Sequence, residues 1–495
     1  MLARTLLQFF HWYTPEGGKL WSEVADQAES LSQMGVTDVW LPPAYKGASG
    51  AASIGYDTYD LFDLGEFDQK GTVATKYGDL ASLQKATRSL TDAGVGVIHD
   101  VVFNHKMGAD ETERVHVRRA NPDDRNQIED EAFEASAYTR FTFPGRQGKH
   151  SKFIWDMKCF SGVDHLEDPD ENGVFRIANE YGAGEWNAEV DDEVGNFDYL
   201  MGSDIEFRNN AVYEELKFWG RWLPEQVACT GFRLDAAKHI PAWFFRDWVG
   251  HVRETVHPEL FVVAEYWHPD MDVLQRYLDQ VDKQLMLFDV ALHHHFYEAS
   301  KAGGGFDLRT IFDGSLTASI PDHAVTLVSN HDTQPLQAME ASVEPWFKPL
   351  AYALILMREQ GTPCIFYPDL YGAKYRDSGD DGETHEVEMP AIPCLPKLIE
   401  ARKRFAHGAQ TDIFDDPHCI AIIRAGTAEE QGSVTILSNG EEARKTVPVG
   451  EGHAGQGFRD YLGHCEEEIF TDDAGNLEVR VNGGSVSVWV RSDAM

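Results

Sequence analysis

Apolar and polar positions along the first hundred residues follow the pattern of a strand and then an amphipathic helix, repeated. Residues 6–10, 36–41 and 95–103 are predicted as strands, because each is a short and nearly continuous apolar run. Between them, apolar residues recur at helical spacing over 24–34 and 80–90, before Gly35 and Gly94. Apolar strands separated by amphipathic helices predict a parallel sheet with helices on both faces.

The same alternation resumes after residue 206. Helices are predicted at 242–256, 271–281 and 345–360, and strands at 231–235, 260–266, 285–290, 325–329 and 364–367. Together with the three earlier strands, these five give eight strands in an α/β chain. Eight parallel strands with helices between them are typical of a (β/α)8 barrel, the TIM barrel.

Two segments lack this alternation. Residues 104–206 are loop-rich and acidic, with only short strand candidates such as 139–143, and they are too long for an ordinary strand-to-helix loop. The last hundred residues contain short strands divided by Asn-Gly and Gly-Gly turns, as in antiparallel sheets. We therefore predict three domains: a barrel over 1–103 and 207–393, an inserted domain over 104–206, and a C-terminal β-sandwich over 394–495.

The net charge of the chain limits the classes of partner that it is expected to bind. Its 82 Asp and Glu against 43 Lys and Arg give a net charge of −39 over 495 residues. Such a field repels phosphate backbones and anionic lipid, so we expect neither a nucleic-acid nor a membrane partner. A neutral substrate or a cation is favoured, although the same charge could serve solubility alone.

The sequence favours a cytoplasmic protein. No apolar run reaches the roughly 18 residues of a membrane helix, and the N-terminal segment lacks the cleavage site of an export signal. The six cysteines are widely scattered without a CxxC pair, which favours reduced thiols over disulfides. We expect the protein to be a monomer.

Charged residues follow directly after four of the predicted strands. These segments read DVVFNH from residue 100, GFRLDAAKH from 231, AEYWH from 264 and SNHDT from 329. A single strand-end Asp is most often a helix N-cap. Four such ends on one face of a barrel instead indicate a site, because reactive groups of barrel enzymes lie at the C-terminal ends of strands. Asp235, Glu265 and Asp332 should therefore converge there.

Three converging carboxyl groups suit glycoside hydrolysis, in which one carboxyl protonates the leaving oxygen and another attacks or shields the sugar carbon. Arg233 should keep Asp235 ionised, as a nucleophile requires. Glu265 follows an apolar run that should raise its pKa, as a general acid requires. Asp332, beside His331, should hold substrate hydroxyls and help to keep Glu265 protonated. A catalytic metal is the alternative, but no His-rich ligand spacing accompanies the carboxylates.

The four segments, in this order, resemble the four ordered regions of the α-amylase family of glycoside hydrolases, family 13. The resemblance runs from Leu7 to the closing NGGSVSVWV and is greatest to bacterial liquefying-type members, in particular cytoplasmic ones. It implies a retaining hydrolysis of internal α-1,4-glucosidic bonds in starch, glycogen fragments or maltodextrins. Asp235 would be the nucleophile, Glu265 the acid/base and Asp332 the stabiliser of the transition state.

The resemblance also implies a set of substrate contacts. His105, Arg233 and His331 would surround the central sugar, Tyr56 would stack on it, and Lys238 and His239 would line the leaving-group side. Trp267 is a further candidate because it belongs to the AEYWH segment, and sugar rings stack on aromatic faces.

One structural Ca²⁺ is implied as well. Its ligands would be Asn104, Asp198, Asp204 and the backbone carbonyl of His239, which supply the hard oxygen atoms that calcium prefers. Such an ion would tie the insertion to the barrel beside the cleft.

The sequence departs from the calcium–sodium–calcium cluster of secreted liquefying relatives. Two aspartate positions of that cluster hold Leu166 and Asn187 here, although Asp164 is kept. Leucine offers no ligand and asparagine no charge, so we expect one calcium and not the cluster.

Two other functions compete with hydrolysis. A glucan transglycosylase would use the same carboxylates but resolve the intermediate with a sugar. A non-catalytic glucan-binding protein would be expected to lack one of the three carboxylates, and all three are present.

Overall fold

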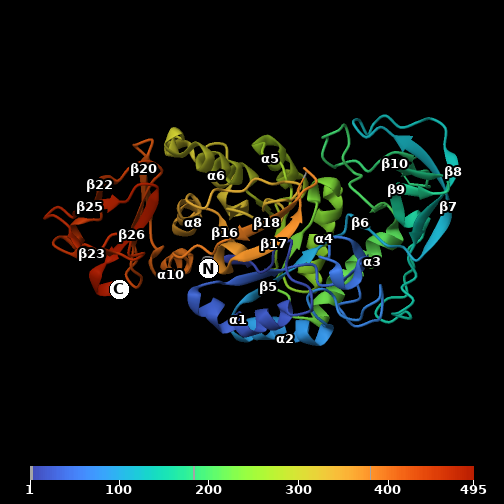
Figure 1. Ribbon diagram of the computed structural model, residues 1–495, viewed down its shortest axis with the longest axis horizontal. Coiled ribbons are helices and arrows are strands. Elements are labelled where there is room, and N and C mark those ends of the chain that lie inside the picture. The colour runs from blue at the N-terminus through green and yellow to red at the C-terminus, as the bar shows by residue number, and fades with distance from the viewer. Residues whose placement is uncertain (1–3, 182–183, 380) are drawn as a thin grey trace.

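The computed structural model of the chain describes residues 4–181, 184–379 and 381–495. Figure 1 shows an elongated molecule whose central barrel lies between the inserted segment at one end and the C-terminal strands at the other. The domain boundaries after residues 103, 206 and 393 stay predictions.

The barrel has eight parallel strands, as predicted. They follow one another around it in chain order, and the last strand pairs with the first. The strands are β1 (Leu6–Gln8), β2 (Asp38–Leu41), β5 (Gly96–Val101), β12 (Gly231–Leu234), β13 (Phe261–Ala264), β14 (Met286–Phe288), β15 (Ala324–Leu327) and β16 (Thr362–Phe366). Almost all of their residues are buried, because helices cover the outside and side chains fill the interior.

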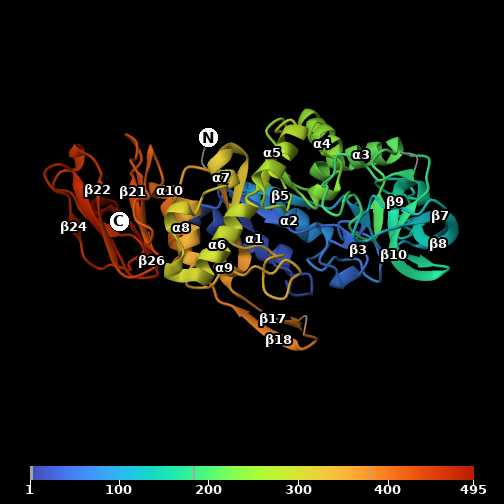
Figure 2. The ribbon, with the colours of Figure 1, turned by 90° about the horizontal axis from the view of Figure 1, so that it is seen from above.

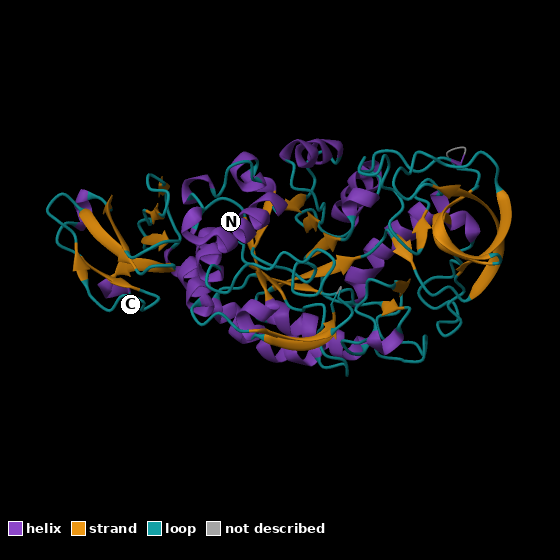
Figure 3. Cartoon of the chain, turned by 45° about the horizontal axis from the view of Figure 1, so that its top comes forward, coloured by secondary structure: helices purple, strands orange, loops and turns teal. Residues whose placement is uncertain are grey.

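Helices surround the barrel strands (Figure 3). They are α1 (Leu20–Met34), α2 (Leu80–Asp92), α3 (Asn210–Gln226), α4 (Ala242–Thr255), α5 (Met271–Gln280), α6 (Val290–Ala302), α7 (Leu316–Ser319), α8 (Lys348–Met357), α9 (Tyr367–Tyr371) and α10 (Leu395–Phe405). The helix predicted at 345–360 is the shorter α8. The pattern does not predict α3, which contains Pro224. It also does not predict α6, because that helix is buried on most of its turns and its apolar and polar residues therefore alternate only weakly.

The prediction of a loop-rich insertion is wrong in one respect. The segment contains a sheet of six strands in the order β6-β11-β9-β10-β7-β8, on the right in Figure 1. They are β6 (His105–Lys106), β7 (Glu111–Ala120), β8 (Phe133–Arg140), β9 (Phe160–Glu167), β10 (Asp170–Ile177) and β11 (Ser203–Ile205). Charged side chains on the exposed positions of β7 hide its strand pattern, since only Val115, Val117 and Ala120 are buried. The candidate at 139–143 is the end of β8 and a single bridge.

The C-terminal strands are antiparallel, as predicted. One sheet has the order β19-β20-β21-β26-β23-β24, and a second pairs β22 with β25. Apolar residues of both sheets, including Ile436, Val479 and Trp489, form one shared core. The strands are β19 (Gln410–Ile413), β20 (Cys419–Arg424), β21 (Ser433–Ser438), β22 (Ala443–Pro448), β23 (Gly457–Asp460), β24 (Ile469–Phe470), β25 (Asn476–Val481) and β26 (Ser485–Arg491).

Two short hairpins complete the sheets. β3 (Lys46–Gly47) pairs with β4 (Thr58–Asp60), and β17 (Ala373–Ser378) pairs with β18 (Thr384–Met389). Figure 2 shows the β17–β18 hairpin projecting from the barrel after its last strand.

All six cysteines are free thiols. Among the described residues, no helix combines the length and the apolar character that crossing a bilayer requires.

Candidate active site

The predicted catalytic carboxylates share one cleft at the C-terminal ends of the barrel strands. Asp235 follows β12 directly, Glu265 follows β13, and Asp332 lies on the loop after β15. All three line a cavity of about 390 Å³. Six predicted substrate contacts line the same cavity: Tyr56, His105, Lys238, His239, Trp267 and His331.

Arg233 lies below the cleft and contacts two of the predicted catalytic carboxylates, together with a third carboxylate, Asp100. Its side chain points into the barrel from β12 and is only 1% exposed. Nη1 donates to Asp235 Oδ1 at 2.6 Å and to Asp100 Oδ1 at 2.9 Å, and Nη2 forms an ion pair with Glu265. A guanidinium keeps its charge and its planar geometry when buried. Arg233 therefore fixes the positions of three carboxylates at once.

Burial raises the pKa of each of the three predicted catalytic carboxyl groups, although Arg233 opposes the shift. The pKa of Asp235 rises to about 6 and that of Glu265 to about 7, and that of Asp332 lies well above its usual range. Arg233 favours the ionised form of Asp235, as predicted, but desolvation outweighs this ion pair, so the net pKa of Asp235 still rises.

Like-charge repulsion links the three carboxyl groups. Asp235 raises the pKa of Glu265, and Glu265 raises the pKa of Asp332. Because such repulsion is mutual, the predicted repulsion between Asp332 and Glu265 is present. Glu265 still keeps its proton to higher pH than Asp235, which is the order that an acid and a nucleophile require.

Aromatic rings form one wall of the cleft. Tyr56 stacks on His331 with ring centroids 5.1 Å apart, and Trp12 stacks on Tyr56 at 5.9 Å. The hydroxyl of Tyr56 donates to Asp100 Oδ2 at 2.9 Å, which fixes the ring. These parallel faces suit the apolar faces of sugar rings.

The polar residues of the cleft are held by hydrogen bonds. His331 Nδ1 lies 3.0 Å from Gln8 Nε2, and His331 Nε2 lies 3.3 Å from Asp332 Oδ2. Burial lowers the pKa values of His331 and His105, so both imidazoles are neutral hydrogen-bonding groups at pH 7. Lys238 Nζ donates to Glu193 Oε2 at 2.7 Å at the rim.

The predicted calcium ligands lie where the insertion meets the barrel. Asn104, Asp198, Asp204 and His239 are all buried. Asn104 Nδ2 donates to Asp204 Oδ1 at 3.3 Å, whereas Asn104 Oδ1 and Asp198 Oδ1 are buried without a hydrogen-bond partner. Buried oxygen atoms without partners are costly unless a ligand satisfies them.

This donor set fits a hard cation. It supplies two carboxylates, an amide oxygen and a backbone carbonyl, which is the ligand chemistry of calcium. Burial raises the pKa of Asp198 to about 6 and that of Asp204 well above its usual range, so the two carboxylates lack sufficient positive charge nearby. The described residues contain no group of three or more His, Cys, Asp and Glu side chains around one metal position, so a cation here would need the amide and carbonyl oxygens as well.

The positions that depart from the three-metal cluster are close by. Leu166 is fully buried, and Asp164 Oδ2 accepts a hydrogen bond from the backbone of Gly202 at 2.8 Å. Asn187 donates to Asp198 Oδ2 from its backbone and side chain, at 2.9 and 3.0 Å. Asn187 therefore orients a predicted calcium ligand.

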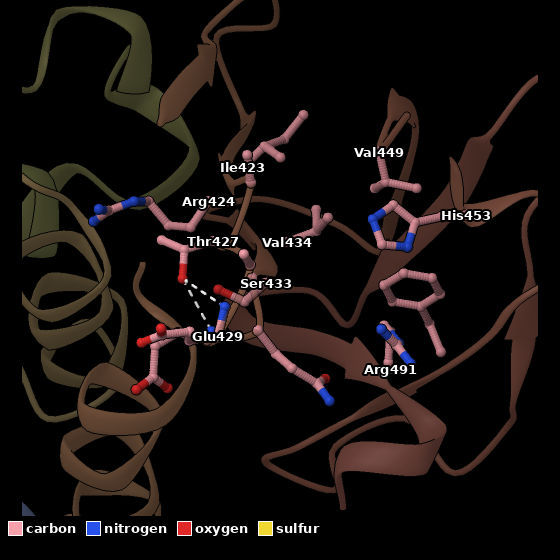
Figure 4. A pocket seen from close by; sticks show the side chains of 15 residues that line it. Ile423, Arg424, Thr427, Glu429, Ser433, Val434, Val449, His453 and Arg491 are labelled. Carbon is pink, nitrogen blue, oxygen red and sulfur yellow. Dashed lines mark hydrogen bonds between the residues drawn. The ribbon is translucent and has the colours of Figure 1, made fainter. Parts of the chain in front are cut away.

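A second cavity, of about 280 Å³, lies among the C-terminal strands (Figure 4). Ile423, Val434 and Val449 line it together with polar loop residues. The hydroxyl of Thr427 accepts hydrogen bonds from the backbone of Glu429 and of its neighbour, which closes the loop on itself. None of the four strand-end segments contributes to this cavity, so the barrel cleft is the candidate active site.

Comparison with known proteins shows the family of the chain. The family model "Alpha amylase, catalytic domain" matches residues 17–392. The chain belongs to the alpha-amylase family. It is 58% identical to the cytoplasmic alpha-amylase of Escherichia coli K12 over 98% of both chains. It is 44% identical to an alpha-amylase of Geobacillus stearothermophilus, over 98% of this chain and 86% of the relative.

Solved structures of alpha-amylases share the fold. The structure of the Geobacillus thermoleovorans alpha-amylase in complex with acarbose matches with a TM-score of 0.64 at 17% identity, over 99% of this chain and 98% of that chain. At this level of identity, the match supports the architecture alone.

Several residues of this alpha-amylase cleft are absent from the set predicted from sequence. Asp100 opens the DVVFNH segment but points inward, where it binds Arg233, Tyr56 and the indole of Trp40. Trp12 lies directly beyond the first strand, a position that could have marked it. Phe197, Leu200, Met201 and Met339 also line the cleft but carry no sequence signal, because they come from irregular loops.

Proposed function

We propose that the chain is an α-amylase, an endo-acting and retaining hydrolase of α-1,4-glucosidic bonds. The observation that carries the proposal is the pair Asp235 and Glu265, held by one buried guanidinium in a cleft that also contains Asp332. Membership of the alpha-amylase family and 58% identity to a named alpha-amylase support the same activity.

In the first step, Glu265 donates its proton to the glycosidic oxygen while Asp235 attacks the anomeric carbon. The bond from that carbon to the leaving oxygen breaks, and a covalent glycosyl-enzyme forms on Asp235. In the second step, Glu265 accepts a proton from water, which attacks the same carbon and releases Asp235. The higher pKa of Glu265 supports this division of roles.

The closeness of the two carboxyl groups supports retention of configuration. Both contact the guanidinium of Arg233, and their side chains interact directly. Retaining glycosidases have carboxyl groups about 5–5.5 Å apart, whereas inverting ones leave room for a water molecule at about 6.5–9.5 Å.

The remaining cleft residues would bind the sugar. Asp332 would hold hydroxyl groups and stabilise the positive charge of the transition state. Neutral His105 and His331 would donate hydrogen bonds, and Tyr56 would stack on the ring. Trp267 would contribute a further aromatic contact, and Lys238 and His239 would line the leaving-group side. Arg233, predicted as a sugar contact, is buried below the cleft and would act on the sugar through the carboxylates that it holds.

A bound Ca²⁺ would be held by Asn104, Asp198, Asp204 and the backbone carbonyl of His239. The ion would neutralise buried carboxylates and connect β6 and β11 of the insertion to the loop after β12. Its contribution would be structural, since it would order the wall of the cleft.

We further propose a cytoplasmic location and neutral α-glucans as partners. The similar protein of E. coli is named a cytoplasmic alpha-amylase. The net charge of −39 suits uncharged starch, glycogen fragments or maltodextrins and disfavours nucleic acid and anionic lipid. We propose a monomer.

Digestion of maltoheptaose tests the function against its two alternatives. An α-amylase releases only shorter maltooligosaccharides, whereas chains longer than the donor would show a transglycosylase. Asp235→Asn should abolish turnover but keep glucan binding and the melting temperature. Full turnover by this variant would refute Asp235 as the nucleophile, and binding without turnover by the unaltered protein would identify a non-catalytic glucan-binding protein.

A further inference from the structure

A buried arginine lies beside the proposed calcium ligands. The side chain of Arg176, on β10, is 0% exposed, as is that of its ion-pair partner Glu206 at 3.4 Å. Its Nε and Nη2 donate to the backbone carbonyl of Glu185 at 3.1 and 2.8 Å. Its guanidinium carbon lies 5.3 Å from the ring centre of Trp186. Nothing in the proposed hydrolysis uses this charge.

Sheet register places Arg176 in line with a calcium ligand. Gly162 on the central strand β9 pairs with Arg176 on one side and with Asp204 on the other. Residues directly opposite each other across a sheet share a face, so Arg176 and Asp204 lie on the same face, two strands apart. A Cβ atom at Gly162 would lie 2.9 Å from Trp186, so only glycine leaves room for the ring that packs on Arg176.

Ser161 connects the two residues directly. Its backbone carbonyl accepts a hydrogen bond from Arg176 Nη1, and its hydroxyl donates to Asp204 Oδ2. The positive charge of Arg176 is therefore held in place relative to Asp204 by one residue of β9.

The charges in this region limit how many cations the acidic cluster can hold. Asp198, Asp204 and Glu206 are buried carboxylates, and Arg176 and Arg208 are the guanidinium groups that act on them. The sum of these five groups is one negative charge. One divalent ion would leave one positive charge, whereas two divalent ions and a monovalent ion would leave four.

We propose that Arg176 is a fixed cation of this acidic cluster. The charge of Arg176 takes the place of additional metal ions, so that a single Ca²⁺ completes the site. The inference rests on the calcium site proposed above, and it explains why the cluster tolerates Asn187 where the three-metal relatives carry an aspartate. Arg176 is a positioning residue here, because it contacts neither the sugar nor the reacting atoms.

The charge of Arg176 should affect the stability of the metal-free protein and the affinity for Ca²⁺ in opposite directions. The guanidinium stabilises the metal-free protein, because it compensates buried carboxylates, and it weakens Ca²⁺ binding, because like charges repel. Arg176→Gln should therefore lower the melting temperature in EDTA and increase the stabilisation by Ca²⁺. The dissociation constant for Ca²⁺ should fall by about tenfold or more, because the screening of buried charges is weak.

Two further variants separate charge from packing. Arg176→Lys keeps the charge but loses most of the hydrogen bonds, so its Ca²⁺-induced shift should match that of the unaltered protein even if it melts earlier. Arg119→Gln is the matched control, because Arg119 lies on the opposite face of the same sheet, 40% exposed and paired with Glu171 at 2.8 Å. It should leave the Ca²⁺-induced shift unchanged.

The test measures melting temperature in EDTA and in Ca²⁺, and the bound metal per chain by mass spectrometry, with and without Na⁺. We expect one Ca²⁺ per unaltered chain and no dependence on Na⁺. Two or more ions per chain, or an equal Ca²⁺-induced shift in Arg176→Gln and Arg119→Gln, would overturn the proposal. If Arg176→Gln can be isolated only with Ca²⁺ present, its affinity for Ca²⁺ is measured by competition with a chelator. An affinity equal to that of the unaltered protein would also overturn the proposal.

Failure of the proposed function gives a different result. A chain that binds one Ca²⁺ and shows the predicted Arg176 effect, but does not cleave maltoheptaose, refutes the hydrolase alone. A chain that cleaves maltoheptaose but binds no Ca²⁺ refutes the calcium site and the role of Arg176 together.

Discussion

Asp100 is the buried carboxylate that anchors Arg233, and its replacement by asparagine tests the electrostatics of the cleft. Asp100 Oδ1 and Asp235 Oδ1 both contact Arg233 Nη1, at 2.9 and 2.6 Å, so they lie at most about 5.5 Å apart. The charge of Asp100 raises the pKa of Asp235. Asp100→Asn removes that charge and should lower the pKa of Asp235.

The size of the effect follows from this distance. At an effective dielectric constant of about 20, two unit charges about 5.5 Å apart interact by about 3 kcal/mol, or about two pKa units. The limb of the pH profile that reports ionisation of Asp235, at about 6 in the unaltered protein, should therefore move to lower pH by one to two units. Loss of a charge-assisted hydrogen bond of about 1.5–3 kcal/mol should also lower kcat/KM by about 10- to 150-fold.

The assay is kcat/KM on a soluble maltooligosaccharide between pH 4 and pH 9, where the limbs report the free enzyme. Asp38→Asn is the matched control, because Asp38 is a buried aspartate on the neighbouring strand β2 whose partner is Arg4 at 2.6 Å. It should leave the acidic limb in place. An acidic limb that stays put or moves to higher pH in Asp100→Asn would refute the reasoning.

Three further predictions concern the cleft and the metal. The unaltered enzyme should show a bell-shaped profile of kcat/KM against pH. The value should fall below about pH 6, because Asp235 takes up a proton, and above about pH 7, because Glu265 loses its proton. A flat profile over this range would contradict both assignments. Glu265→Gln should lose hydrolysis of maltoheptaose but keep much of its rate on maltosyl fluoride, whose leaving group needs no proton; equal losses on both substrates would exclude Glu265 as the acid. EDTA should lower the melting temperature by several degrees and added Ca²⁺ should restore it; an unchanged transition would count against the calcium site.

The aromatic wall of the cleft is expected to contribute to substrate binding. Trp12→Ala should raise KM by about 2- to 12-fold with little change in kcat, since aromatic stacking is worth about 0.5–1.5 kcal/mol. Phe470→Ala is a suitable control, because Phe470 is an exposed aromatic of the C-terminal sheet. A fall in kcat without a change in KM would show that Trp12 acts on the chemistry and not on binding.

The barrel could be predicted because its signals are local. Buried parallel strands such as β13 are continuous apolar runs, and reactive residues such as Glu265 follow them directly. The same logic places the cleft, because the C-terminal ends of all eight strands meet at one face.

Features that depend on distance could not be predicted. Asp100 lies 133 residues from Arg233 in the chain, and only the pairing of β5 with β12 in the barrel brings the two side chains together. The net pKa of Asp235 depends on how deeply that contact is buried, which neighbouring residues in sequence do not reveal. The strands of the insertion are not apparent in the sequence because Glu and Arg occupy half of the positions in β7 and only three of its residues are buried. The register that aligns Arg176 with Asp204 likewise exists only in the folded sheet.

The most direct test of the catalytic account is to trap the glycosyl-enzyme. A fluorinated maltosyl fluoride, which forms the intermediate faster than water removes it, should inactivate the enzyme with one label per chain, and peptide mapping should locate that label on Asp235. Proton NMR of an untrapped reaction should show the α-anomer as the first product. A label on Glu265 or Asp332, or a β-anomer as the first product, would contradict the account.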